Sequence, residues 1–520
     1  MSTYMSPGVY IKEEEAGSRP IEGVGTAVAA FVGFAERGPA NSPTLVTNWG
    51  QYQATFGDFV AGTFLPLAVY QYFDNGGGAA YVVRIGADDS ASANGPSEPV
   101  ATAELASAAI AGTTTYEISA RQVDDAGGTL SVEVIHDPAD GDEAPETFSI
   151  VVREDGTERE RHDGLSTRKG STNVATVVNA ASALITIDDV SSLTLAEKLP
   201  ALGTVELAAP TAAAMMPDAV TSDDLIGDAA DRSALGGLDA IDEVTMVAVP
   251  DLMALYKQGV LDLEGVKAVQ LGIIGHCERM GDRMAILDPP PGLNAQEILD
   301  WRVDFAGYDS KFATLYWPWV KVVDPGAGRT DFVPPSGAIA GLWGRTDDAR
   351  GVHKAPANDV VRGALDVHIN ITKNEHDLLN PKGINVIRSF PGRGIRVWGA
   401  RTLSSDPAWR YLNVRRLFNY VEQSILDGTQ WAVFEPNDMD LWQRISRTIR
   451  GFLLTQWREG ALFGATPDEA FYVKCDEETN PPELVDNGQV TVEIGIAPVR
   501  PAEFVVFKVA QLSSGGGVSE

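Results

Sequence analysis

Hydrophobic positions recur with helical spacing in two segments of the last third of the chain. Within 411–426 and 438–459, apolar residues follow one another at intervals of three or four, which places them on one face of an α-helix. The first stripe comprises Val414, Leu417, Phe418, Val421 and Ile425, and the second comprises Leu441, Trp442, Ile445, Ile449 and Phe452. The opposite side of the second helix, or its flank, carries Asp440, Arg444, Arg447 and Arg458. We therefore expect two amphipathic helices here.

Short apolar runs alternate with helix-like segments between 241 and 325. The strand-like runs are 245–251, 284–289 and 312–317, which 320–323 continues. The helix-like segments are 265–276 and 294–305. Strands that alternate with helices indicate a parallel sheet that is covered on both faces.

The segment 88–235 differs from the rest of the chain in composition. It is rich in Ala, Ser, Thr and Asp, and strand-like runs occur at 116–119, 129–135 and 147–152. Residues 88–110 have the composition of a linker. Residues 88–239 hold 8 Lys and Arg against 28 Asp and Glu, a net charge of −20 within a chain total of −32, which is typical of a solvated surface. We expect an inserted, mainly β domain with one or two helices.

Composition restricts the class of protein. The 520 residues, 44% hydrophobic and 22% charged, are typical of about three to four globular domains. The strong negative charge argues against nucleic acid as the main partner, because phosphate would be repelled. The two cysteines stand in unrelated contexts, which favours a reducing compartment. The first residues do not resemble a signal peptide, and the longest apolar run, 24–35, is too short for a bilayer, so we expect cytoplasmic assembly without membrane insertion.

Both ends of the chain contain short apolar runs outside the predicted domains. In residues 1–20, Val9, Tyr10 and Ile11 form an extended patch before three glutamates. Such a segment cannot bury a face of its own, so it is either a frayed terminus or a strand that needs a partner sheet. Alternating residues in 490–496 and the run 504–509 predict strands, and the Gly/Ser-rich tail 513–520 is expected to be disordered.

Carboxylates at the ends of the predicted core strands are candidates for an active site. Asp251, Asp288 and Asp324 follow apolar runs, and ligands of open α/β sheets bind at that edge. Paired carboxylates there could bind a metal or act as acid and base. Each aspartate also adjoins a proline, and this combination is more often only a turn.

Other candidate groups carry weaker signals. His276-Cys277 invites a nucleophile or metal interpretation, although a His at a helix C-terminus is commoner. Ser336 has no protease motif around it, Gly76–Gly78 lacks the lysine of a phosphate-binding loop, and His353 and His368 lack metal-ligand spacing.

Seven arginines lie among aromatic residues and glycines in 383–420 of this acidic chain. They are Arg388, Arg393, Arg396, Arg401, Arg410, Arg415 and Arg416. A nucleic-acid site would need a basic surround, which is missing. Arginine forks suit bidentate contacts with carboxylates, so we expect Arg396, Arg401, Arg415 and Arg416 to form ion pairs within the subunit or with a neighbour.

This arginine-rich stretch and six further fragments resemble the contractile tail sheath proteins, which form the shortening outer tube of contractile phage tails, tailocins and related injection systems. The other fragments are 6–13, 19–39, 73–84, 431–437, 470–476 and 495–504. Together the matching parts cover roughly 1–87 and 240–512, whereas 88–235 carries no matching motif.

The resemblance implies an α+β multidomain fold with an α/β, subtilisin-like core. The expected parts are an N-terminal arm (1–20), the core in two pieces (21–87 and 236–375), the inserted acidic outer domain (88–235), a C-terminal α+β sheath domain with an arm strand (376–512) and the tail (513–520).

The resemblance also implies a structural function: stacked hexameric rings around an inner tube, which contract to drive the tube through a target envelope. The expected partners are further copies of the chain, the inner tube protein, and baseplate and cap or terminator proteins. Strand exchange is expected at Val9, Tyr10, Ile11, Phe504, Val505, Val506 and Phe507, and contact with the tube at Asp440, Arg444, Arg447 and Arg458. No catalytic, cofactor or metal residue is expected.

Two alternatives remain open from the residues. One is a hydrolase that uses the strand-end carboxylates. The other is a different assembly protein, such as a tube or capsid subunit, against which the insertion and the α/β core argue.

Overall fold

The structure is a computed structural model that describes residues 20–86, 102–110, 113–121, 130–136, 147–154, 156–190, 193–195, 197–207, 220–325 and 328–507. The chain divides into two compact units, one of Met1–Ala87 with Met216–Glu520 and one of Asp88–Met215. The expected insertion boundary at 235 is therefore too late. Leu225 and Leu235 are buried in the core of the first unit, so the segment before 236 belongs to that core.

An eight-stranded sheet forms the centre of the first unit, in the order β18-β17-β13-β12-β11-β1-β3-β2. Its strands are β1 (Val28–Gly33), β2 (Thr44–Val46), β3 (Ala79–Arg84), β11 (Met246–Ala248), β12 (Met284–Leu287), β13 (Ala313–Trp317), β17 (Ile384–Phe390) and β18 (Gly394–Val397). The six inner strands run parallel and the two edge strands antiparallel. This pairing confirms the predicted parallel core. Parallel strands are joined by helical crossovers, which bury the sheet on both faces.

Helices cover both faces of this sheet. They are α1 (Trp49–Phe56), α2 (Leu65–Asp74), α4 (Ser222–Ile226), η2 (Ala234–Ala240), α5 (Asp251–Gln258), α6 (Leu263–Met280), α7 (Ala295–Asp300) with the π-helical turn η3 (Trp301–Ala306), α8 (Ser336–Arg350), α9 (Lys373–Leu379) and η4 (Asn380–Lys382). From β1 the chain moves to β3 on one side of the sheet, and from β11 it moves to β12 and β13 on the other side. Because each of these crossovers is right-handed, α2 lies on one face of the sheet, and α6 and α7 lie on the other. The predicted helices 265–276 and 294–305 are confirmed as α6 and as α7 with η3.

One predicted core strand lies elsewhere. β14 (Val320–Asp324) pairs with β15 (Arg329–Val333) and β16 (Asp366–Val367) in a separate antiparallel sheet. The sequence suggested that Asp324 lies at the edge of the main sheet. This prediction is wrong, because the chain leaves the main sheet after Trp317.

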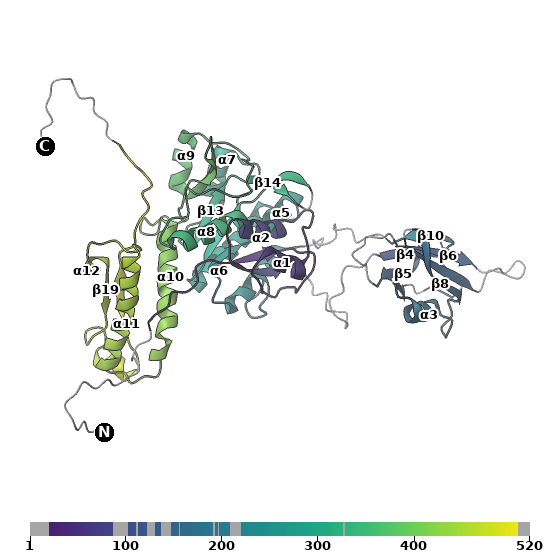
Figure 1. Cartoon of the computed structure of the whole chain (residues 1–520), viewed down its shortest axis with the longest axis horizontal. Helices are drawn as coiled ribbons and strands as arrows, with labels where there is room; N and C mark the ends of the chain where they lie inside the picture. Colours follow the sequence, from purple (N-terminus) through teal and green to yellow (C-terminus); the bar gives the residue numbers. More distant parts are fainter. Residues whose placement is uncertain are drawn as a thin grey trace, which may run out of the picture. The chain divides into compact units, whose positions relative to one another are not determined.

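The C-terminal part contains α10 (Leu412–Thr429), η5 (Gln430–Ala432), α11 (Met439–Arg458), α12 (Pro467–Ala470), β19 (Phe471–Lys474), α13 (Pro482–Asp486) and β20 (Glu493–Ile496). The two amphipathic helices are confirmed, and they lie side by side (Figure 1) around a shared core that includes Leu417, Val421, Ile445 and Phe452. The expected boundary at 376 is wrong, because β17 and β18 belong to the core sheet. Residues 504–507 form no strand within the isolated chain, and 508 and 509 lie outside the described residues.

The second unit has its own core. A sheet of β4 (Thr102–Ala106), β5 (Thr114–Ala120) and β9 (Ile185–Asp189) lies with a sheet of β10 (Gly203–Glu206), β6 (Leu130–His136), β7 (Phe148–Glu154) and β8 (Thr157–Leu165), and with α3 (Val174–Ala181). The mainly β character is confirmed. The linker expected at 88–110 is wrong in part, because Leu105 of β4 is buried in this core.

Candidate functional site

The strand-end carboxylate Asp251 holds the core together. It is fully buried, and its Oδ2 accepts the backbone N–H of Phe34 at 2.6 Å. Its Oδ1 accepts the N–H of Leu65 at 3.1 Å and also that of Phe64. The carboxylate thereby joins the end of β1 to the first turn of α2, where the orphan N–H groups of a helix need acceptors.

Asp288 plays a similar part at the end of β12. Its Oδ1 accepts the backbone N–H of Ser336, the first residue of α8, at 3.1 Å. Burial raises the pKa of Asp288 to about 7 and that of Asp251 to about 6, although their hydrogen bonds act in the opposite direction. Both side chains therefore serve as buried acceptors for helix starts distant in the sequence, which is a structural role but not the local turn that their prolines suggested.

The other enzyme candidates have packing roles. Cys277 is fully buried, and burial raises the pKa of its thiol well above the usual value, which makes it unreactive. His276 Nδ1 lies 2.9 Å from Asp239 Oδ1, and burial together with Arg283 lowers its pKa to about 4. Ser336 is buried. Among the described residues, no group of three or more His, Cys, Asp and Glu side chains is placed to hold a metal.

The remaining candidates are also explained by packing. A Cβ on Gly77 would lie 2.3 Å from the ring of Tyr72, so this glycine loop allows a close approach to α2. His368 packs edge-on against Phe332 at 5.3 Å, and His353 is half-buried. No described helix is long and apolar enough to cross a membrane.

Three of the candidate arginines bind carboxylates within the chain. Arg416 of α10 and Asp347 of α8 are both buried and share two hydrogen bonds, of 2.9 and 2.6 Å. Arg401 binds Glu503 in the same bidentate manner, at 2.9 and 2.6 Å. Arg415 Nη2 lies 2.9 Å from Glu422 Oε2. The first pair fastens α10 to the core and the second fastens the C-terminal segment to it, whereas Arg415 and Glu422 both lie within α10.

Arg396 behaves differently and shares the β17–β18 hairpin with two other arginines. Its Nη1 donates to the carbonyl of Asn358 at 2.6 Å, and its Nε donates to that of Arg393 at 2.9 Å. The guanidinium of Arg393 lies over the rings of Phe390 and Trp398, at 5.5 and 5.9 Å. Within the described part of the chain, none of the ion pairs involves Arg388, Arg393 or Arg396.

The outer face of α11 is basic. Arg447 and Arg458 are exposed, as the periodicity predicted, and Asp440 lies exposed in the first turn. Arg444 is half-buried, lies 3.1 Å from Glu435 and stacks on Trp431 at 4.6 Å. Sequence reasoning missed Arg450, which is also exposed and lies three residues after Arg447, so the helical spacing contained the signal for it.

Four apolar side chains near the C-terminus lie in solvent. Phe504, Val505, Val506 and Phe507 are 68% to 84% exposed, and they directly follow Glu503, which Arg401 holds. Val9, Tyr10 and Ile11 lie outside the described residues. An exposed apolar run of this length indicates an interface, because a monomer gains nothing from it.

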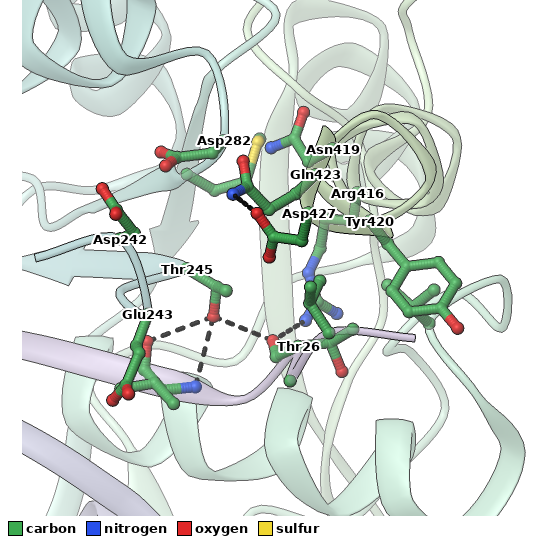
Figure 2. Close-up of a pocket in the computed structure, with 15 residues that line it drawn as sticks. Thr26, Asp242, Glu243, Thr245, Asp282, Arg416, Asn419, Tyr420, Gln423 and Asp427 are labelled. Atoms are coloured by element: carbon green, nitrogen blue, oxygen red, sulfur yellow. Dashed lines mark hydrogen bonds between the residues drawn. The ribbon is translucent and has the colours of Figure 1, made fainter. Parts of the chain in front are cut away.

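A pocket of about 340 Å³ lies between the amino ends of β1, β11 and β12 and the side of α10. Figure 2 shows Asp242, Glu243, Asp282 and Asp427 around it. The hydroxyl of Thr245 donates to the carbonyl of Thr26 at 2.9 Å, and Arg416 Nη2 donates to the same carbonyl at 3.0 Å. Nothing in the sequence pattern pointed to this pocket, because its lining comes from five segments that are separate in the sequence: 24–28, 242–245, 282–284, Val352 and 416–427.

Comparisons with known proteins agree with the architecture. The family described as "Phage tail sheath protein central domain" matches residues 229–403, and "Phage tail sheath C-terminal domain" matches 404–511. The tail sheath protein of Burkholderia phage BcepMu is 24% identical over 527 residues, which cover 96% of this chain and 95% of that one.

Solved sheath structures share the fold. The contracted helical sheath of the anti-feeding prophage aligns with a TM-score of 0.59 and 25% identity, over 98% of this chain and 100% of that chain. The contracted PVC sheath complex, from an extracellular contractile injection system, aligns with a TM-score of 0.57 and 22% identity, over 98% and 99%. The two family domains together span more than half of the sequence, and the chain therefore belongs to the contractile tail sheath family.

Proposed function

We propose that this chain is the subunit of a contractile sheath that assembles as stacked hexameric rings around an inner tube. The family is a structural one and not a family of enzymes. The observation that carries the proposal is the exposed apolar run Phe504–Phe507 next to the ion pair of the half-buried Glu503 with the buried Arg401. A segment fixed at one end and apolar beyond it is suited to add a strand to the sheet of a neighbouring subunit.

The contraction mechanism follows from such connections. The arms, Val9–Ile11 at one end and Phe504–Phe507 at the other, keep neighbouring subunits linked while the rigid cores move. The extended state is kinetically trapped, and repacking into a shorter, wider state releases free energy without a nucleotide. The sheath assembles in the cytoplasm on a baseplate, is closed by a cap protein, and drives the tube through a target envelope.

The tube-facing surface in this proposal is the basic face of α11. Arg447, Arg450 and Arg458 are exposed there, whereas Arg444 already has Glu435 as a partner. Exposed ion pairs are individually weak, which suits a surface that must release the tube on contraction. The hydrolase alternative loses its support, because Asp251 and Asp288 are occupied as caps.

The first test is negative-stain electron microscopy of the chain expressed alone. We expect tubes or rings of sheath dimensions, and we expect that a chain without residues 1–20 or with Phe504→Ser and Val506→Ser stays dispersed. Melting followed by circular dichroism checks that these variants fold. A wild-type chain that remains a monomer at high concentration would contradict the proposal.

The tube contact needs its own test. Arg447→Glu with Arg458→Glu should abolish extended sheath on purified tubes and leave sheath-alone tubes intact. Arg329→Glu with Lys373→Glu makes the same change in charge at exposed positions outside α11 and should have no effect. Unchanged extended sheath in the α11 variant would remove this face from the proposal.

A further inference from the structure

The hairpin of β17 and β18 presents a fixed cationic surface. Arg388 and Arg393 both lie over the ring of Phe390, at 5.4 and 5.5 Å, and Arg396 is held by two backbone carbonyls. Aromatic rings and carbonyl groups thus orient three guanidinium groups. No ion pair among the described residues uses any of them, so their charge is available to a partner.

The pocket beside α10 has the opposite character. Four carboxylates line it, and Asp242, Glu243 and Asp427 are exposed. Arg416 also lines it, but its guanidinium is already neutralised by Asp347. Asp282 binds the neighbouring Arg283 at 2.7 Å. Three carboxylates therefore lack a basic partner among the described residues.

The two surfaces lie at opposite ends of the same sheet. β17 runs parallel to β13, so the hairpin tip projects from the carboxyl ends of the strands. The pocket contains Val28 and Met284, the first residues of β1 and β12, and therefore lies at the amino ends. The surfaces cannot meet within one subunit, so a contact between them requires a second copy of the chain.

We propose that the β17–β18 hairpin of one subunit docks into the acidic pocket of a second copy, with Arg393 entering between Asp242 and Glu243. Guanidinium forks form bidentate pairs with carboxylates, and opposite charge fixes the register of the two subunits. A head-to-tail contact of this kind leaves both ends open and so extends into a helix. The proposal rests on the sheath function and names the surfaces that join its subunits.

Charge reversal of each surface tests the contact. We expect Arg393→Glu with Arg396→Glu, and separately Asp242→Arg with Glu243→Arg, to reduce the yield of tubes about tenfold, because like charges then face each other. An equimolar mixture of the two variants should recover assembly, since each mutant surface meets its complement. The pair Arg329→Glu and Lys373→Glu serves as the control, and circular dichroism melting verifies folding.

Recovery in the mixture establishes the contact. Wild-type yields from both reversed variants, or failure of the mixture to recover, overturn it.

A disulfide cross-link separates this contact from the sheath function. In a Cys475→Ser background, a chain with Arg393→Cys and Asp242→Cys should form a ladder of oligomers under mild oxidation, and either single cysteine should stop at dimers. A ladder of oligomers without tubes would support the contact and contradict the sheath function. Tubes without a ladder would support the sheath function and contradict the contact.

Discussion

At the scale of single residues, the carboxylates that most resembled catalytic groups have a structural function. Asp251 and Asp288 stand where open α/β sheets bind ligands. The helices α2 and α8 begin at the same edge, next to these two carboxylates. A buried helix start leaves N–H groups that need acceptors, and each carboxylate supplies them. Position at a strand end is therefore insufficient to identify an active site without an open path to solvent.

Removal of the Asp251 cap should be costly. We expect Asp251→Ala to lower the free energy of unfolding of the first unit by about 3 kcal/mol, because buried N–H groups of three residues lose their acceptor. Asp251→Asn keeps one acceptor oxygen and should lose less. Denaturant titration followed by tryptophan fluorescence measures both, with the exposed Asp377→Ala as control. Equal stability of the alanine variant and the control would contradict the assigned role.

Asp288 should make stability depend on pH. Burial raises its folded pKa from 3.8 to about 7, so the folded state keeps a proton that the unfolded state releases between these values. Its stabilising contribution is complete below pH 3.8 and is lost as the pH rises to about 7. Relative to Asp288→Asn, the wild type should lose about 2 to 4 kcal/mol over this range. Parallel pH profiles in thermal melts would show that Asp288 does not titrate there.

At the scale of elements, a buried ion pair attaches α10 to α8. Arg416 and Asp347 are 4% and 8% exposed, and the guanidinium also lies 4.7 Å from the centre of the Trp343 ring. The pair bridges the α/β core and the C-terminal helices. Such a contact couples the two parts of the first unit.

Truncation of one partner should weaken this attachment. We expect Arg416→Ala to lower the free energy of unfolding by about 3 to 5 kcal/mol, because Asp347 stays buried without its counterion. The double variant Arg416→Met with Asp347→Leu should recover most of the loss. A double-mutant cycle in urea measures the coupling. A single variant as stable as the wild type would mean that water reaches Asp347.

At the scale of the whole molecule, the chain is two compact units with separate cores. Phe148, Ile150 and Tyr116 belong to the core of the second unit, and its residues cluster apart from those of the main sheet. The acidic second unit enters the first between β3 and α4. Its residues bury a hydrophobic core of their own.

Deletion of the second unit should therefore leave the first intact. We expect a chain with 88–215 replaced by a short Gly-Ser linker to melt within about 3 °C of the wild-type transition of the first unit and to form tubes. Deletion of 88–235 is the matched control and should destabilise it, because it removes the buried Leu225 and Leu235. Circular dichroism and electron microscopy compare the two, and equal melting of both variants would refute the boundary at Met215.

Periodicity in the sequence was enough to locate α6, α10, α11 and three of the inner strands, β11, β12 and β13, because such patterns depend on neighbours within a few positions. The family resemblance was also local, since it rested on short motifs in order along the chain. The exposure of Arg447 and Arg458 on α11 followed from the same 3.6-residue spacing. These features required no knowledge of distant contacts.

The tertiary structure alone decided which distant residues meet. Asp347 and Arg416 are 69 positions apart, as Asp251 and Leu65 are 186 apart, and no local pattern relates them. The same reason explains why β14 left the main sheet while β17 and β18 joined it. The acidic pocket arose only when 24–28, 242–245, 282–284, Val352 and α10 came together, because a surface belongs to the packed fold and not to any one segment.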